Sequence, residues 1–256
     1  MEDVEQLSVA FGEALFFTTA CPGREVNEDA IGVFPLGEGR AVLAVADGVG
    51  GQPAGESASR RTLECLWDAL LAAPDSEESL RTPILDGIEA GNRALLEAGH
   101  GAAATLAVAE LRGRELRSYH VGDAAILLVG QRGRVKLQTV AHSPVGYAVE
   151  AGLLDPEDAL HHEERHLISN AVGAPDMRIE IGSRLVLGRR DTLLLATDGL
   201  FDNVHQGELN ETIRTGALEK AGRSLPATCR ARMEAAAPGL PSKPDDLAFV
   251  LFRPGR

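Results

Sequence analysis

Carboxylates that stand beside apolar runs are the residues of this chain best placed to do chemistry. They are Glu28, Asp29, Asp47, Asp123, Asp198, Asp245 and Asp246. A carboxylate next to a buried strand is unfavourable unless it is paired or binds a cation. Carboxylates that converge would also repel one another unless cations lie between them. Because the pattern offers only oxygen ligands, it predicts a shared site for hard divalent ions such as Mg²⁺ or Mn²⁺.

An aspartate followed by glycine is also a common turn signal, and for a single Asp-Gly that interpretation is the simpler one. Here Asp47-Gly48 and Asp198-Gly199 each come directly after a continuous apolar run, which favours a site. The following Gly50-Gly51 indicates close approach of the backbone to a ligand. A phosphate-binding loop is disfavoured, because Gly48–Gly55 lacks the Gly-Lys-Ser/Thr ending of that motif.

Apolar runs predict the strands that carry these carboxylates, and helical spacings predict the helices between them. Strands are expected at 41–46, 191–196 and 247–252, with a strand pair or bent strand over 117–129 and an alternating strand over 179–187. Helices are expected at 55–71 and 77–97, and one or two more over 210–237. A further helix is expected to begin at Pro156, with Asp155 as its N-cap. This order predicts an α+β fold with an antiparallel sheet core.

Composition limits the class of protein. The 256 residues show no composition break, which predicts a single domain over 1–256. The net charge of −13 disfavours nucleic-acid binding, which needs basic surface. No apolar run approaches the ~20 residues of a membrane helix. An acidic N-terminus unlike a signal peptide and three scattered cysteines indicate a cytoplasmic protein with no membrane role.

Five short motifs in order resemble those of metal-dependent protein phosphatases of type 2C (the PPM family), bacterial branch. They are Arg24–Asp29, Ala46–Gly51, Val121–Asp123, Ala196–Asp202 and Asp245–Ala248. The segment 142–173 is similar to the flap of that family, and the resemblance spans residues 9–253. It implies an α-β-β-α sandwich of two antiparallel sheets flanked by helix pairs.

The resemblance also implies the metal ligands. The family binds two divalent ions, Mn²⁺ or Mg²⁺, which share a bridging water. By motif, Asp47 would bridge both ions and the Gly48 carbonyl would hold one of them. Asp198 and Asp245 would bind the other ion.

Further residues take roles from the same resemblance. Glu28 and Asp29 would lie at or just behind the water ligands. Asp123, with Asp198, would form the third, weaker ion site of the bacterial branch, to which the flap contributes at the position of His166. Arg24 would bind phosphate, since its planar fork can hold two oxygens at once. Taken alone, Arg24 would be interpreted as a solvated surface charge.

The implied function is hydrolysis of phosphoserine and phosphothreonine in proteins by the water between the ions, without a covalent intermediate. The implied partners are phosphoprotein substrates of a serine/threonine kinase system, and we expect a monomer. One alternative is a catalytically silent relative that binds phosphoproteins, which the presence of Asp47, Asp198, Asp245 and Arg24 disfavours. Another is a phosphomonoesterase for small molecules, which the sequence does not separate from the first.

Some residues depart from the family pattern or suggest another chemistry. Ala124-Ala125 stands where the family often has Ser-Arg, and Val49 stands where some relatives have a histidine that can donate a proton. His162-Glu163 and His166 match the HExxH pattern of zinc proteases. That match lies in a charged segment aligned with the flap and has no supporting third ligand. We therefore expect these histidines to be solvated helix residues.

Overall fold

The fold contains two antiparallel sheets. In the first sheet the strands are β1 (Glu5–Val9), β2 (Gly12–Thr19), β7 (Ala125–Val129), β8 (Val135–Gln138), β11 (Thr192–Ala196) and β12 (Leu247–Pro254). In the second they are β3 (Asp29–Pro35), β4 (Arg40–Val49), β5 (Ala103–Arg112), β6 (Glu115–Val121), β9 (Glu180–Ile181) and β10 (Leu185–Val186). The computed structural model describes residues 4–37, 39–49, 54–73, 79–99 and 101–255.

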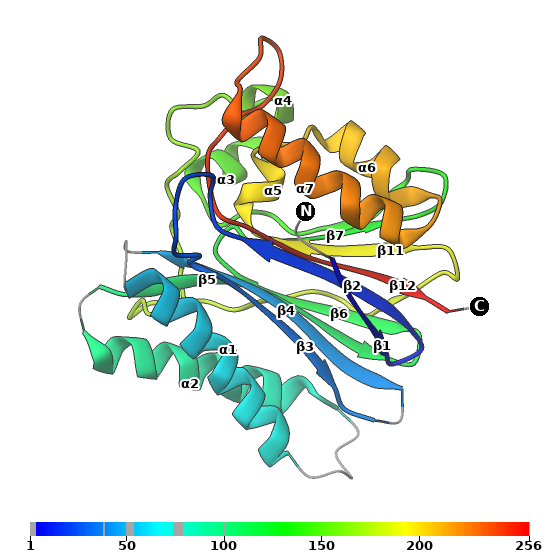
Figure 1. The fold of residues 1–256 in the computed structure, drawn as a ribbon. Coiled ribbons are helices and arrows are strands. Elements are labelled where there is room, and N and C mark those ends of the chain that lie inside the picture. The colour runs from blue at the N-terminus through cyan, green and yellow to red at the C-terminus, as the bar shows by residue number, and fades with distance from the viewer. Residues whose placement is uncertain (1–3, 38, 50–53, 74–78, 100, 256) are drawn as a thin grey trace.

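Helices cover the outer face of each sheet. The helices of the described residues are α1 (Ala54–Ala72), α2 (Arg81–Ala98), α3 (Pro144–Glu150), α4 (Pro156–Ala159), α5 (Asp198–Phe201), α6 (Gln206–Arg214) and α7 (Leu218–Glu234), of which α3 and α4 belong to the 142–173 segment. The pair α1 and α2 lies against the sheet of β3 to β6, and α5, α6 and α7 lie against the other sheet (Figure 1). The expected α-β-β-α sandwich is therefore confirmed.

Three apolar layers hold the sandwich together. One lies between the sheets and includes Leu43, Leu195 and Phe252. The others lie between each sheet and its helices, with Leu66 on one side and Leu225 on the other. Central strands are thus covered on both faces, which explains why β4, β11 and β12 appear in the sequence as unbroken apolar runs.

Most of the expected elements are confirmed. The strands at 41–46, 191–196 and 247–252 form, as does the helix at 55–71, and the 210–237 pattern divides into α6 and α7. Asp155 caps α4, because its Oδ1 accepts the Glu157 N–H at 2.8 Å. The helix expected over 77–97 is α2, which begins at Arg81. Residues 77 and 78 lie outside the described residues, as do Gly50 and Gly51 of the second motif.

Three expectations were wrong in detail. The segment 117–129 does hold two strands, β6 and β7, but they do not pair with each other, because they belong to different sheets. The strand over 179–187 is reduced to β9 and β10, which pair with β6 as two separate short strands. Residues 161–166 form turns rather than a helix, although the three histidines there are exposed as expected.

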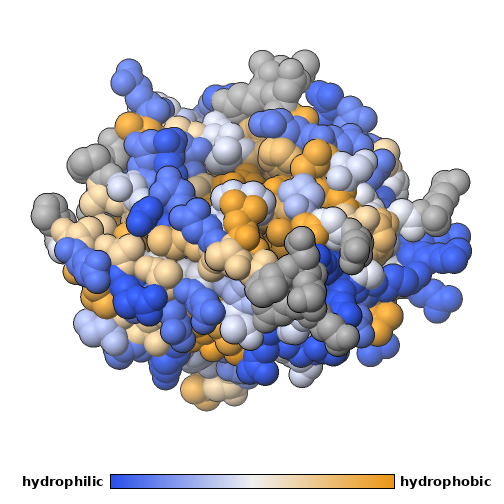
Figure 2. All heavy atoms as spheres, turned by 90° about the horizontal axis from the view of Figure 1, so that it is seen from below, coloured by the Kyte–Doolittle hydropathy of each residue, from blue (hydrophilic) through white to orange (hydrophobic). Residues whose placement is uncertain are grey.

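The surface on the side of α1 and α2 mixes hydrophobic and hydrophilic residues (Figure 2). Exposed apolar side chains on these helices include Leu71 and Leu96. None of the helices in the described part of the chain is both long and apolar enough to cross a membrane.

Candidate active site

The predicted carboxylates converge at one end of the sandwich, where both sheets contribute. In the second sheet the antiparallel register sets Asp29 of β3 directly opposite Asp47 of β4. In the first sheet β11 runs into α5, whose first residue is Asp198, and Asp245 lies two residues before the start of β12. Residues far apart in sequence therefore meet because strand ends of both sheets lie together.

Thr197 joins the two sheets at this point. Its hydroxyl donates to Asp29 Oδ2 at 2.7 Å, and the same oxygen accepts the Ala248 N–H at 3.1 Å. Thr197 is fully buried, so both bonds are shielded from water. This contact fixes one oxygen of Asp29 relative to the end of β11.

Asp246 has a structural role that the sequence did not indicate. Its two carboxylate oxygens accept the N–H groups of Cys21 and Glu28, each at 2.7 Å. The side chain is almost fully buried. Asp246 thus ties the 21–28 segment, which carries Arg24, to the start of β12, while its neighbour Asp245 belongs to the carboxylate cluster.

Gly48 lies where the chain approaches the first turn of α1. A Cβ at Gly48 would lie 2.1 Å from the Gly55 carbonyl oxygen, so no other residue fits there without moving backbone. The Gly48 N–H donates to the Glu28 carbonyl at 3.1 Å. This packing positions the peptide between Asp47 and Gly48 beside Glu28.

A glycine and a histidine hold the turn before Asp123. Gly122 has a φ of +92°, a conformation that favours glycine, and it redirects the chain from β6 toward β7. His142 Nδ1 accepts the Gly122 N–H at 3.1 Å and an Asn170 Nδ2–H at 2.8 Å. His142 therefore links the Asp123 turn to both ends of the 142–173 segment.

Mutual repulsion and burial raise the pKa values of the clustered carboxyls. Burial, with the nearby Asp198 charge, raises the pKa of Asp123 to about 7. The same two causes raise the pKa of Asp202 to about 6 and raise that of Asp245. Burial also raises the pKa values of Asp29 and Asp47 well above their usual range, with neighbouring carboxylates adding to the effect. Such a group of buried acids requires positive charge to ionise together.

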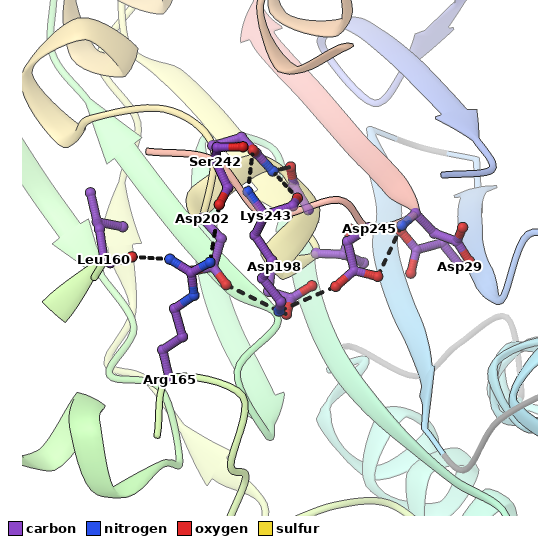
Figure 3. Close-up of polar contacts among 12 residues, drawn as sticks. Asp29, Leu160, Arg165, Asp198, Asp202, Ser242, Lys243 and Asp245 are labelled. Atoms are coloured by element: carbon purple, nitrogen blue, oxygen red, sulfur yellow. Dashed lines mark hydrogen bonds and ion pairs between the residues drawn. The ribbon is translucent and has the colours of Figure 1, made fainter. Parts of the chain in front are cut away.

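Lys243 supplies part of that positive charge. Its ammonium makes an ion pair with Asp198, lies 3.1 Å from Asp202 Oδ2 and lies 3.2 Å from Asp245 Oδ2 (Figure 3). Burial lowers the pKa of this lysine, but the three carboxylates outweigh that effect and the pKa lies above its ordinary value. Sequence reasoning missed Lys243, although it stands two residues before Asp245.

The remaining predicted residues differ in their exposure. Arg24 is exposed. Burial raises the pKa of Glu28, and the charge of Arg24 opposes that rise only in part. Glu28 itself is buried beside the Gly48 backbone. His166 is exposed within the turns of 161–166. Because these turns do not form a helix, His162 and His166 lack the helical spacing that a zinc-protease site requires.

The donor set fits hard divalent ions. Every candidate ligand is a carboxylate or the Gly48 carbonyl, which are ligands that Mg²⁺ and Mn²⁺ prefer. Glu28 Oε1 and Asp123 Oδ1 are buried oxygens without a hydrogen-bond partner in the described part of the chain. Buried acceptors are normally satisfied, so these oxygens favour a bound cation or its waters.

A second group of donors lies nearby but is satisfied internally. His120, His142 and Glu180 place one ligand atom each within 4.8 Å of the others. Because His142 Nδ1 accepts two N–H groups, the neutral ring carries its proton on Nε2, which lies 3.2 Å from Glu180. His120 Nε2 bonds the Val140 carbonyl at 2.9 Å. Hydrogen bonding, rather than metal ligation, accounts for this cluster.

Comparison with known proteins identifies the family. The family model described as protein phosphatase 2C matches residues 23–225. The chain belongs to the protein phosphatase 2C family. The expected family and enzyme class are thereby confirmed, and the carboxylate cluster lies at the phosphatase motifs quoted above.

Individual relatives agree in sequence and in fold. The serine/threonine phosphatase stp of Listeria monocytogenes is 31% identical over 204 residues, covering 75% of this chain and 79% of the relative. The solved serine/threonine phosphatase of S. agalactiae is 28% identical, with a TM-score of 0.82, covering 96% of this chain and all of that one. Serine/threonine phosphatase Stp1 of Staphylococcus aureus is 26% identical, with a TM-score of 0.81 over the whole of both chains.

Proposed function

We propose that this protein is a metal-dependent phosphatase that hydrolyses phosphoserine and phosphothreonine in proteins. The observation that carries the proposal is the convergence of Asp29, Asp47, Asp198 and Asp245 from both sheets, in a chain of the protein phosphatase 2C family. The relatives named above are serine/threonine phosphatases, which supports phosphoprotein substrates.

Asp47 with the Gly48 carbonyl would hold one divalent ion, and Asp47 with Asp198 and Asp245 would hold the other. Two ions at these oxygens, Mn²⁺ or Mg²⁺, would activate water and stabilise the charge of the transferring phosphoryl group. Asp29, fixed by the Thr197 hydroxyl, and the buried Glu28 would orient the waters around the ions.

Arg24 would bind the phosphate of the substrate. It stands on the 21–28 segment, which Asp246 fixes to the start of β12, and its side chain is exposed to incoming ligand. A guanidinium can donate to two phosphate oxygens at once, which orients the ester for attack. Asp246 would act here as a positioning residue.

The wider context follows from the same assignment. The phosphoprotein substrates would be the products of a serine/threonine kinase system in the cytoplasm, and we expect the enzyme to be a monomer of one domain. The alternative of a small-molecule phosphomonoesterase predicts a different ratio of rates on peptide and small ester.

Hydrolysis of a phosphothreonine peptide and of para-nitrophenyl phosphate, in Mn²⁺, Mg²⁺ or EDTA, tests the proposal. Asp47→Asn is the diagnostic variant because Asp47 makes no ion pair with Lys243 among the described contacts. Asp86→Asn, an exposed aspartate on α2, is the matched control. We expect metal-dependent release of phosphate that falls at least ~100-fold in Asp47→Asn and is unchanged in Asp86→Asn.

Three results would overturn the proposal. Equal activity in EDTA and in Mn²⁺ would contradict a metal-dependent reaction. Bound metal without hydrolysis of either substrate would favour a silent, phosphoprotein-binding relative. A high rate on the small ester with none on the peptide would instead favour the small-molecule phosphomonoesterase.

A further inference from the structure

A cavity of about 240 Å³ lies between helix α7 and the strands β2 and β12. Figure 1 shows α7 lying over these strands on the outer face of their sheet. Cavities that bind drug-sized ligands measure roughly 300–1,000 Å³. This cavity is smaller, so its size suits a side chain of a larger ligand rather than a whole small molecule.

The buried part of the cavity lining is apolar. It is formed by the side chains of Phe17, Met233 and Leu247. The Phe17 ring stacks on Phe249 at a centroid distance of 5.7 Å, which holds it in place. An apolar group that entered the cavity would gain by leaving water, whereas a charged group would lose its hydration. The lining therefore favours an apolar side chain.

Short side chains on one face of α7 keep the cavity open. The lining residues of this helix recur every three or four positions, so they share a face: Arg223, Pro226, Ala227, Arg230 and Met233. At Gly222 the helix lies tightly against β2, because a Cβ there would be 2.3 Å from Leu15 Cδ2. Pro226 and Ala227 come one turn later, and their side chains are too short to fill the space beside this contact.

Arginines at the exposed rim are paired with acids of the same helix. Arg223 makes an ion pair with Glu219 at 3.0 Å, and Arg230 makes one with Glu234 at 3.3 Å. All four side chains are exposed, so water screens these pairs. The rim thus has no need of an anionic ligand, and the apolar lining decides what the cavity accepts.

The cavity shares a wall with the candidate active site. Asp245 lines the cavity, and its Oδ2 also lies 3.2 Å from Lys243 Nζ within the carboxylate cluster (Figure 3). Pro22 lines the cavity as well, two residues before Arg24. Asp246 fixes the segment that carries both of these residues to the start of β12. The same contacts therefore hold the cavity beside the cluster.

A phosphoprotein substrate must lay its chain across this region. Its phosphoryl group has to reach the carboxylate cluster, so the residues on either side of the phosphoresidue pass over the neighbouring surface. Successive residues of an extended chain are about 3.3 Å apart. A side chain within a few residues of the phosphoresidue can therefore reach a cavity whose wall includes Asp245.

We propose that this cavity receives an apolar side chain of the phosphoprotein substrate, a few residues from the phosphoserine or phosphothreonine. The proposal rests on the proposed function, because it presumes that phosphoproteins are hydrolysed at the carboxylate cluster. Under it, α7 selects among substrates through the space that Pro226 and Ala227 leave open, and it takes no part in the chemistry.

Phosphothreonine peptides that differ at a single position test the proposal. Each position near the phosphothreonine carries in turn Leu or Asn, which are similar in shape but differ in polarity, in an otherwise constant sequence. The measured quantity is the ratio of kcat/KM for the Leu peptide to that for the Asn peptide in Mn²⁺. We expect a ratio of at least ~10 at one position, mainly through KM, because the contact is present before and during the reaction.

Two variants of Ala227 connect this ratio to the cavity. Ala227→Phe fills the cavity and should bring the ratio close to that of peptides without preference. Ala227→Lys places an ammonium at the wall and should raise kcat/KM for a peptide with Asp at that position relative to the Asn peptide. Ala231→Phe, at an exposed position of α7 outside the described lining, is the matched control and should keep the Leu preference. Each ratio compares two peptides on the same enzyme, so a partial loss of folded protein cancels.

Several outcomes would overturn the proposal. Equal kcat/KM for the Leu and Asn peptides at every position would do so and leave the proposed function standing, as would a Leu preference that persists unchanged in both Ala227 variants. A change of oligomeric state in those variants, seen by gel filtration, would instead assign the cavity to a second copy of the chain. Absence of Mn²⁺-dependent hydrolysis of every peptide would overturn this proposal and the proposed function together.

Discussion

At the scale of single residues, adjacent aspartates of one motif take different roles. Asp245 faces the carboxylate cluster, whereas Asp246 accepts the N–H groups of Cys21 and Glu28. Successive side chains along extended backbone point to opposite sides, so only one of the two could face the site. That alternation was a usable signal in the sequence, but the partners of Asp246 were not, because they lie 225 and 218 residues away.

We expect the Asp246→Ala variant to be less stable than the unaltered protein and to bind the phosphate of the substrate more weakly. It removes two charge-assisted hydrogen bonds, and we expect the free energy of unfolding to fall by about 2–3 kcal/mol. Urea denaturation measures this change, with Asp86→Ala as the control. Because the 21–28 segment carries Arg24, KM for a phosphopeptide should also rise. Unfolding at the urea midpoint of the control would mean that Asp246 does not hold this segment.

Asp123 gives the metal-free protein a predictable dependence on pH. The folded chain keeps a proton on Asp123 up to a pKa of about 7, whereas the unfolded chain loses it near the ordinary value of 3.8. The folded state thus binds more protons in this interval, so the free energy of unfolding in EDTA should rise as pH falls from about 7 to about 4.

Asp123→Asn should reduce this dependence on pH and raise the free energy of unfolding at pH 8 by roughly 1–2 kcal/mol, because the buried charge is removed. Urea denaturation in EDTA at pH 8 and pH 5.5 measures both effects. We assign the pH dependence of stability that remains in Asp123→Asn to the other buried acids, including Asp202. If the free energy of unfolding of the unaltered protein fell between pH 8 and pH 5.5, this explanation would be contradicted.

At the scale of elements, Thr197 at the β11–α5 junction connects the two sheets beside the cluster. Thr197→Val keeps the shape of the side chain but leaves Asp29 Oδ2 and the Ala248 N–H without their partner. We expect the free energy of unfolding to fall by about 1–3 kcal/mol and kcat to fall more than KM rises. Thr197→Ser retains the hydroxyl and should recover most of both losses. If the valine variant matched the serine variant, the hydroxyl would have no such role.

The elements that could be predicted from sequence are those with a strong local pattern. Strand β4 and helix α1 follow from continuous apolar runs and from helical spacing, and Asp47 and Asp198 follow from their places after such runs. The division of the strand expected over 179–187 into the short strands β9 and β10 could not be predicted, because two residues carry no periodicity. The position of Lys243 among the carboxylates depends on the contact between Asn203 and the 242–244 segment, which only the tertiary structure shows.

At the scale of the whole molecule, the negative charges of the cluster make stability depend on metal. The chain carries a net charge of −13, and several of its buried carboxyls have raised pKa values. A ligand that binds only the folded state stabilises it by about 2.7 kcal/mol at one hundred times its dissociation constant. For a chain of this size, that corresponds to a rise in Tm of roughly 5–10 °C.

Thermal unfolding in Mn²⁺ and in EDTA measures this stabilisation. Protons and metal ions compete for the same oxygens, so the rise in Tm should be larger at pH 8 than at pH 6. Asp47→Asn should lose most of the rise, whereas Asp86→Asn should keep it. A rise that is equal in Asp47→Asn and the unaltered protein would place the stabilising ion elsewhere.

The most direct test of the central claim is anomalous X-ray diffraction at the manganese edge from crystals grown in Mn²⁺. The claim is that the carboxylates of the two sheets form the metal site of the enzyme. We predict anomalous peaks in contact with oxygens of Asp47, Asp198 and Asp245 and with the Gly48 carbonyl. Peaks at His120, His142 and Glu180, with none at those carboxylates, would contradict the claim.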